Sequence, residues 1–154
     1  MLLLTHTEPE FTRLIQERTP RIAQMPFVQD LMKKYTSGYL TKKRLAAAIA
    51  VGTLPMVTLE AVSGGASGSQ SGDNIAIDTA YFTGFKEGHP NTVKIVSVTV
   101  FHELAHWGYW KGQQEGHPSD AFGREHNNHG EYMSPLNGQM YKLFDALMVI
   151  RLLF

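Results

Sequence analysis

The chain has 154 residues, of which 18% are charged and 43% apolar, and its formal net charge is zero. This length predicts one domain, residues 1–154, with a buried core, and the balanced charge argues against nucleic acid as the main partner. No cysteine is present, so any metal must be bound by His, Asp or Glu. No apolar run reaches the ~20 residues of a membrane span, and the opening MLLL is too short for a cleavable signal peptide.

Residues 8–50 are predicted to be mainly helical. Apolar residues recur near helical spacing in FTRLIQERTPRIAQM, where Pro20 is expected to break the helix. Pro26 stands at a favourable first-turn position for the next helix. Thr41 precedes KKRLAAAIAV and is expected to cap a further helix through its side-chain oxygen.

Two strands are predicted next, because the apolar period changes from helical to alternating. PMVTLEAV (55–62) alternates in polarity, and NIAIDTAYF (74–82) is rich in β-favouring residues on one face. The Gly/Ser-rich segment between them, residues 63–73, is expected to be a flexible loop, and the two strands can pair across it.

A long helix is predicted from about Asn91 to Trp110, with Asn91 or Thr92 as its cap. Its many β-branched residues favour a strand by propensity alone. A helix is nevertheless predicted, because the histidine motif described below requires helical spacing. Residues 111–134 are predicted to form a polar loop, and Ser134 precedes an amphipathic closing helix. These elements predict an α+β fold with N-terminal helices, a small β-sheet, a long active-site helix and a C-terminal helix.

The segment VFHELAHWGYW (100–110) carries the chemistry. In a helix, residues four apart lie on one face, so His102 and His106 can bind one Zn²⁺ together. Glu103 is turned about 100° away and can act on a water without being a ligand. The sequence therefore predicts two zinc ligands and a general base. If the histidines made only core hydrogen bonds, three polar groups would have to be buried at a cost.

A third ligand must come from the segment that follows the helix. Two common solutions fail, because Tyr109 and Gly112 stand where the longer HExxHxxGxxH motif needs Gly and His, and no cysteine is present. Glu125 lies at a distance after His106 that suits a His-His-Glu site. The run of residues 126–129 is expected to form a polar wall. The candidates that remain open are His117, Asp120, Glu125, His126, His129 and Glu131.

HELAHWGYWKG followed by REHNNHG resembles the zincin metallopeptidase domains of bacterial polymorphic toxins, which are effectors delivered by secretion systems. Glu125 and Gly130 match the Glu and the Gly that follow the active helix in that family, so the resemblance implies Glu125 as the third ligand. SDAFG is similar to the Asp-aromatic-Gly element of zincins with an Asp ligand, which ranks Asp120 second. The preceding helix–strand–strand block also fits, and the resemblance covers roughly residues 26–130.

The resemblance implies a zinc-dependent endopeptidase in which Glu103 is the general base. It implies that the strand at 74–82 pairs its edge with extended substrate. The oxyanion needs a donor besides zinc, and His126, His129 and Tyr132 are the open candidates. A protein or peptide substrate and a cognate immunity protein are the expected partners. Delivery by a bacterial secretion system, after a cytoplasmic stage in the producer, is the expected localisation. The alternatives are a zinc-binding module without activity and a zinc hydrolase of a non-peptide bond.

Overall fold

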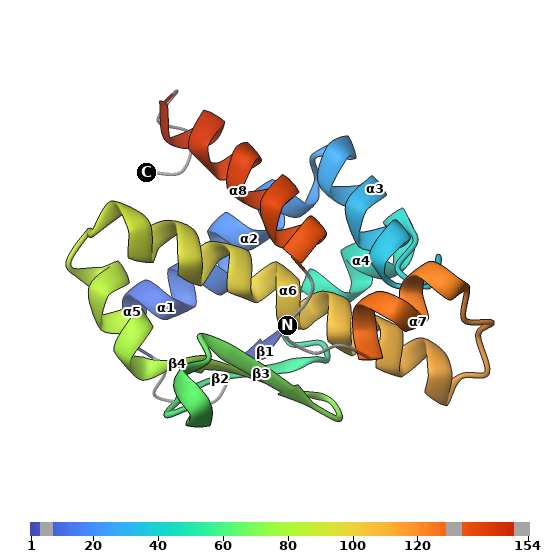
Figure 1. Cartoon of the computed structure of the whole chain (residues 1–154). Helices are drawn as coiled ribbons and strands as arrows, with labels where there is room; N and C mark the ends of the chain where they lie inside the picture. Colours follow the sequence, from blue (N-terminus) through green and yellow to red (C-terminus); the bar gives the residue numbers. More distant parts are fainter. Residues whose placement is uncertain (4–7, 129–133, 150–154) are drawn as a thin grey trace.

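The computed structural model describes residues 1–3, 8–128 and 134–149, whose arrangement is shown in Figure 1. His129, Gly130, Glu131 and Tyr132, which figure in the predictions above, lie outside these residues. The described elements form a small sheet and a set of helices around one long central helix. The prediction of an α+β fold is therefore confirmed.

The N-terminal helices follow the predicted pattern except at Pro20. Helix α1 (Pro9–Arg13) continues through a π-helical turn (Leu14–Arg18) into α2 (Thr19–Ala23), so the break expected at Pro20 is wrong. Proline lacks an N–H and crowds the carbonyl four residues back, and the wider π turn before it accommodates both defects.

The next two helices begin where the sequence predicts. Helix α3 (Pro26–Tyr35) starts at Pro26, and α4 (Lys42–Ile49) is capped by Thr41, whose Oγ1 accepts a hydrogen bond from the Arg44 N–H at 3.3 Å. Both helices are therefore set by local signals that the chain carries at their first residues.

The sheet has the order β1-β2-β4-β3 (Leu2–Leu3, Met56–Glu60, Asn74–Asp78 and Gly68–Ser71, respectively). The predicted pairing of the two longer strands is confirmed: β2 and β4 run parallel, with Val57 opposite Ile75. The segment between them is not a loop throughout, because it contains a 3₁₀ turn (Ser63–Gly65) and β3. Since β3 pairs antiparallel with β4, β4 has neighbours on both sides and the expectation that it offers an edge to substrate is wrong.

The second strand is also shorter than expected, because a helix cap ends it. The Asp78 side chain accepts hydrogen bonds from the N–H groups of Ala80 (2.9 Å) and Tyr81 (3.3 Å) and so starts α5 (Thr79–Lys86). Asp78 also accepts from the Val62 N–H at 2.8 Å. One carboxylate thus ends β4, caps α5 and holds the chain after β2.

Helix α6 (Pro90–Gln114) crosses the middle of the molecule, with the sheet on one side and α8 (Ser134–Val149) on the other (Figure 1). His89 is its N-cap because Pro90 takes the first helical position, so neither Asn91 nor Thr92 caps it. Helix α7 (Ala121–Asn128) occupies part of the region expected to be a loop. The side chains that α6 and α8 bury in the core include Val96, Val100, Phe101, Leu104, Leu136, Met140, Phe144 and Leu147.

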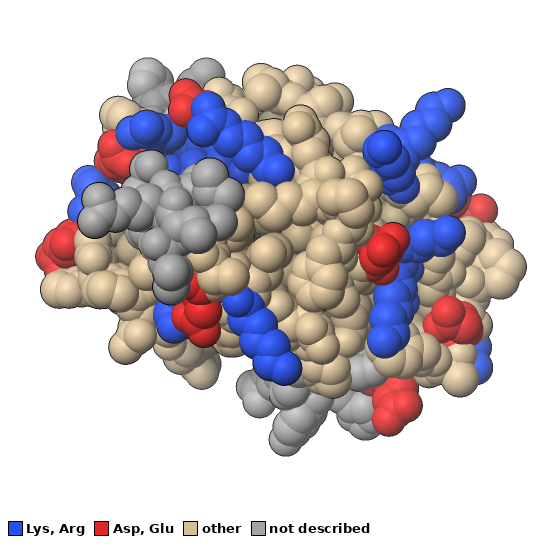
Figure 2. All heavy atoms as spheres, turned by 90° about the horizontal axis from the view of Figure 1, so that it is seen from above, with Lys and Arg blue, Asp and Glu red and all other residues tan. Residues whose placement is uncertain are grey.

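On the surface seen from the α8 side, the described residues of both charge signs are interspersed. Figure 2 shows Lys and Arg side chains toward the flanks, with Asp and Glu among them and an uncharged middle. In the described part of the chain, no helix is both long and apolar enough to span a membrane.

Candidate active site

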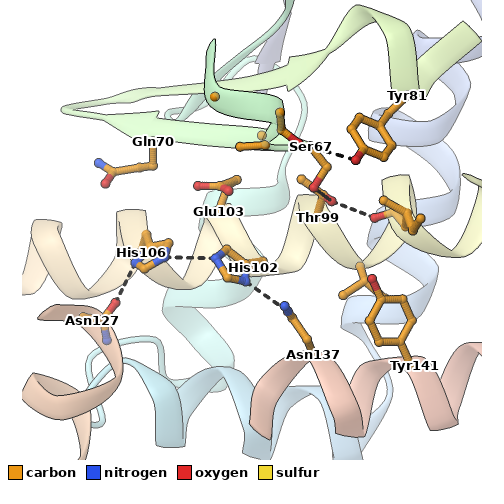
Figure 3. A pocket seen from close by; sticks show the side chains of 16 residues that line it. Ser67, Gln70, Tyr81, Thr99, His102, Glu103, His106, Asn127, Asn137 and Tyr141 are labelled. Atoms are coloured by element: carbon orange, nitrogen blue, oxygen red, sulfur yellow. Dashed lines mark hydrogen bonds between the residues drawn. The ribbon is translucent and has the colours of Figure 1, made fainter. Parts of the chain in front are cut away.

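The two motif histidines converge on one point. His102 and His106 lie one turn apart on α6, their Nε2 atoms are 3.1 Å apart, and their rings meet edge to face with centroids 4.8 Å apart. Both rings line the same cavity (Figure 3). The structure therefore brings together the pair that the four-residue spacing predicts.

An amide oxygen holds the other nitrogen of each ring. His102 Nδ1 lies 3.0 Å from Asn137 Oδ1, and His106 Nδ1 lies 3.1 Å from Asn127 Oδ1. The Asn127 amide is oriented by its Nδ2, which donates to the carbonyls of Tyr35 and Gly123, both at 2.9 Å. Because an amide oxygen only accepts, each Nδ1 carries a hydrogen, and Nε2 is the nitrogen of each ring that is left to bind a metal.

This arrangement fits a metal ion. The two Nε2 atoms face each other at 3.1 Å, a contact that either a proton shared between the rings or a metal ion bound by both can bridge. Two nitrogens bound to a tetrahedral zinc at ~2.0–2.1 Å are about 3.3 Å apart, close to the observed separation. Histidine ligands in proteins are also usually oriented by a hydrogen bond from the second ring nitrogen, as here.

Glu103 lies beside the histidine pair with its carboxylate in the cavity (Figure 3). The residue is only 6% exposed, and burial raises the pKa of its carboxyl group to about 7. A carboxyl group with such a pKa can both accept and return a proton near neutral pH. Its position beside the histidine pair is one from which a carboxylate could act on a water held there.

Strand β3 approaches α6 closely at Gly68. A Cβ atom at Gly68 would lie 2.5 Å from Thr99 Cγ2 and 3.1 Å from Glu103 Cγ, so only glycine permits this contact. The strand is held there by a hydrogen bond between Ser67 Oγ and Thr99 Oγ1 at 2.7 Å and by the Asp78 N–H, which donates to the Ser67 carbonyl at 2.9 Å. The edge strand therefore forms a fixed wall opposite the histidines.

The cavity between β3, α6, α7 and α8 has a volume of about 670 Å³. It extends from the histidine pair along α6 toward the helix N-terminus. Outside the motif, small residues before β3, residues of β3 itself and side chains from α5, α6, α7 and α8 line the cavity. These residues are Gly64, Gly65, Ala66, Ser67, Gly68, Gln70, Tyr81, Ile95, Val98, Thr99, Asn127, Asn137 and Tyr141.

The described side chains do not supply a third ligand. Among them, and they do not include that of His126, no group of three or more His, Cys, Asp or Glu could hold a metal. Glu125 is exposed on α7 and does not line the cavity. Asp120 caps α7, since its Oδ1 accepts from the Gly123 N–H at 2.6 Å and from Ser37 Oγ at 3.2 Å. His117 Nε2 contacts the Ser37 carbonyl at 2.8 Å. The assignment of Glu125 therefore stays a prediction.

Sequence reasoning missed several residues of the site. Asn137 and Tyr141 come from α8, and Tyr81, which was assigned to a strand, lies on α5. Asn127 belongs to the run expected to form a polar wall, but its contact with His106 was not predicted. An amide in the first turn of an amphipathic helix, as at Asn137, carries no local signal for contact with a histidine 35 residues earlier.

Comparison with known proteins adds one finding. The model of the family described as metallopeptidase toxin 3 matches residues 6–136, a range that includes His102, Glu103 and His106. No curated protein and no solved structure matches the chain. Membership implies a metal cofactor, a protein substrate, and secretion or delivery as a toxin. With a match over most of its length and a histidine pair arranged for a metal, the chain belongs to the metallopeptidase toxin 3 family.

Proposed function

We propose that the domain is a zinc-dependent endopeptidase in which His102 and His106 bind the metal and Glu103 is the general base. The observation that carries the proposal is the convergence of two Nε2 atoms at 3.1 Å while both Nδ1 atoms are held by amide oxygens. Imidazole ligands in a chain without cysteine suit zinc, although they also suit other transition metals.

The metal, when bound, supplies a Lewis acid that polarises the substrate carbonyl and lowers the pKa of water. Glu103 accepts the proton of the attacking water on its carboxylate. It then returns this proton to the amide nitrogen as the C–N bond breaks, so the amine leaves uncharged. Glu103 lines the cavity beside the histidine pair, which is the position that both steps need.

Substrate backbone is proposed to bind along β3, which is the edge strand of the sheet beside α6. An extended chain can add to such an edge through backbone hydrogen bonds, with its side chains alternating between the cavity and solvent. Ser67, Gly68 and Gln70 line the cavity from this strand or just before it. A peptide paired there would lie next to Glu103.

Glu125 remains the proposed third ligand, with Asp120, His129 and Glu131 as the alternatives. For a toxin of this family, delivery by a bacterial secretion system and a cognate immunity protein complete the proposal. A peptidase made in the cytoplasm of its producer needs such an inhibitor to spare the producer's own proteins.

The test compares the wild-type protein with Glu103→Gln and His102→Ala. Wild type should carry about one zinc per chain and cleave a peptide library in a chelator-sensitive manner. Glu103→Gln should keep its zinc but lose activity by 10²-fold or more, because only proton transfer is removed, and His102→Ala should lose zinc.

The same assay separates the alternatives. Zinc without cleavage of any peptide or ester would indicate a binding module. Chelator-sensitive cleavage of esters alone would indicate a different hydrolase. Cleavage by Glu103→Gln at the wild-type rate would contradict the assigned base.

A further inference from the structure

The cavity continues beyond the catalytic centre into a part that no catalytic residue occupies. Past His102 toward the start of α6, its walls are Ile95 and Val98 from α6, Tyr81 from α5 and Tyr141 from α8. Figure 3 shows the two tyrosine rings on this side, away from His106 and Gln70. This part, called the tyrosine subsite below, is open to the same space as Glu103.

The tyrosine subsite is apolar at its base and uncharged. Val98 is buried and Ile95 half-buried, and the described lining residues that can ionise, apart from the two tyrosines, are Glu103 and the histidine pair. Lys94, next to Ile95, forms an ion pair with Asp145 at 2.8 Å. Lys94 is near enough to act on the Tyr141 hydroxyl, but its ammonium is paired with Asp145. Among the described residues, a charged group in the tyrosine subsite would therefore find no unpaired counter-charge.

The tyrosine subsite also has room for a large side chain. Its outer wall includes Gly64 and Gly65, which carry no side chain and have φ angles of 74° and 73°, a conformation that favours glycine. The Tyr81 hydroxyl donates to the Gly65 carbonyl at 3.4 Å. Its hydrogen is therefore already bonded, and the ring forms a wall of the subsite. Aromatic and aliphatic walls with few polar groups are typical of sites for apolar groups.

We infer that the tyrosine subsite binds the side chain of one substrate residue that flanks the scissile bond, and that it selects large uncharged side chains such as Leu, Met or Phe. This inference rests on the proposed peptidase function and names the substrate class of the same site. Tyr141 lies beyond residue 136, where the family match ends. The selection therefore depends in part on a stretch of α8 that the family match does not cover.

The first experiment is cleavage of a peptide library randomised on both sides of the scissile bond. One flanking position should prefer Leu, Met or Phe, with Asp, Glu, Lys or Arg there lowering kcat/KM by about tenfold or more. Ile95→Lys and, on a different helix, Tyr141→Arg should each shift that preference toward Asp and Glu. Asn91→Lys adds the same charge to α6 outside the cavity and should leave the preference unchanged.

A second experiment reads the subsite without turnover. Fluorescence anisotropy measures the binding of two labelled peptides to the zinc-loaded Glu103→Gln protein. The peptides are identical except that one has Leu and the other Glu at the preferred position. If wild type cleaves nothing, each flanking position is varied in turn. The Leu peptide should bind about tenfold more tightly, and Ile95→Lys in the same background should reduce or reverse this ratio. Equal binding, or binding of neither peptide, overturns the inference. Absence of cleavage by wild type, with selective binding retained, contradicts the proposed function and leaves the subsite assignment standing.

Discussion

Replacement of Asp78 should destabilise the fold and loosen one wall of the cavity. The side chain is 8% exposed and accepts from the N–H groups of Val62, Ala80 and Tyr81. Asp78→Ala removes a helix cap worth ~1 kcal/mol and leaves the Val62 N–H without this acceptor, at about 1–3 kcal/mol. The free energy of unfolding should therefore fall by roughly 2–4 kcal/mol, and Tm by roughly 5–15 °C.

The dependence on pH identifies the charge as the cause. The Val62 N–H, followed by those of Tyr81 and Ala80, holds the pKa of Asp78 below its ordinary value of 3.8. A lowered pKa in the folded state means that the stabilisation is present above pH 3.8 and is lost as the pH falls through the folded-state pKa. Asp78→Asn keeps one acceptor oxygen and should be less stable than wild type at pH 7, with the difference shrinking in acid.

The measurement is denaturant unfolding of the chelator-treated proteins, because a bound metal would add its own stabilisation. Asp30→Asn removes an exposed carboxylate and should change stability by less than about 0.5 kcal/mol. If Asp78→Asn matched wild type at pH 7, or if its deficit persisted undiminished below the folded-state pKa, the role assigned to this carboxylate would be wrong.

Three further changes test the site. Gly68→Ala should retain zinc but destabilise the fold by about 1–3 kcal/mol and lower peptidase activity, because the methyl group displaces β3 or Glu103; unchanged activity would contradict the close approach. Asn127→Ala should weaken zinc binding about 10–100-fold in a chelator competition, whereas wild-type affinity would show that the amide does not orient its histidine. Glu125→Ala should weaken zinc binding more than Asn127→Ala does. Asp120→Ser keeps an oxygen that can cap α7 and should leave zinc binding unchanged. If Asp120→Ser weakens zinc binding strongly and Glu125→Ala does not, the third ligand is Asp120.

The elements predicted correctly are those with a signal in adjacent residues. Pro26, Thr41 and Ser134 stand at or next to the first residues of helices. Pro26 acts through its fixed backbone angle and Thr41 through its side-chain oxygen. The spacing of His102 and His106 determines their convergence because helix geometry alone brings residues four apart together. Local chemistry was sufficient in all these cases.

The missed elements depend on contacts between distant segments. Strand β3 is formed by the sequence GSQS, which has little intrinsic preference for a strand. It forms because Gly68 alone fits against Thr99 and because β4 provides a partner. Asn137 and Tyr141 reach the site only because α8 packs across α6, so a prediction of their roles requires the tertiary arrangement.

If Glu125 is a metal ligand, helix α7 must change its orientation when the metal binds. Residues two apart in a helix point about 200° apart, so with Asn127 turned toward His106, Glu125 points away from the cavity. Rotation of α7 to bring Glu125 inward would break the Asn127 bonds to His106, Tyr35 and Gly123. If Glu125 is the ligand, α7 must turn on metal binding and exchange these contacts for the metal, so the loss of zinc affinity in Glu125→Ala should exceed the loss in Asn127→Ala. A large loss in Asn127→Ala together with a small one in Glu125→Ala would instead place the third ligand on another residue, with Asp120, His129 and Glu131 the remaining predicted candidates.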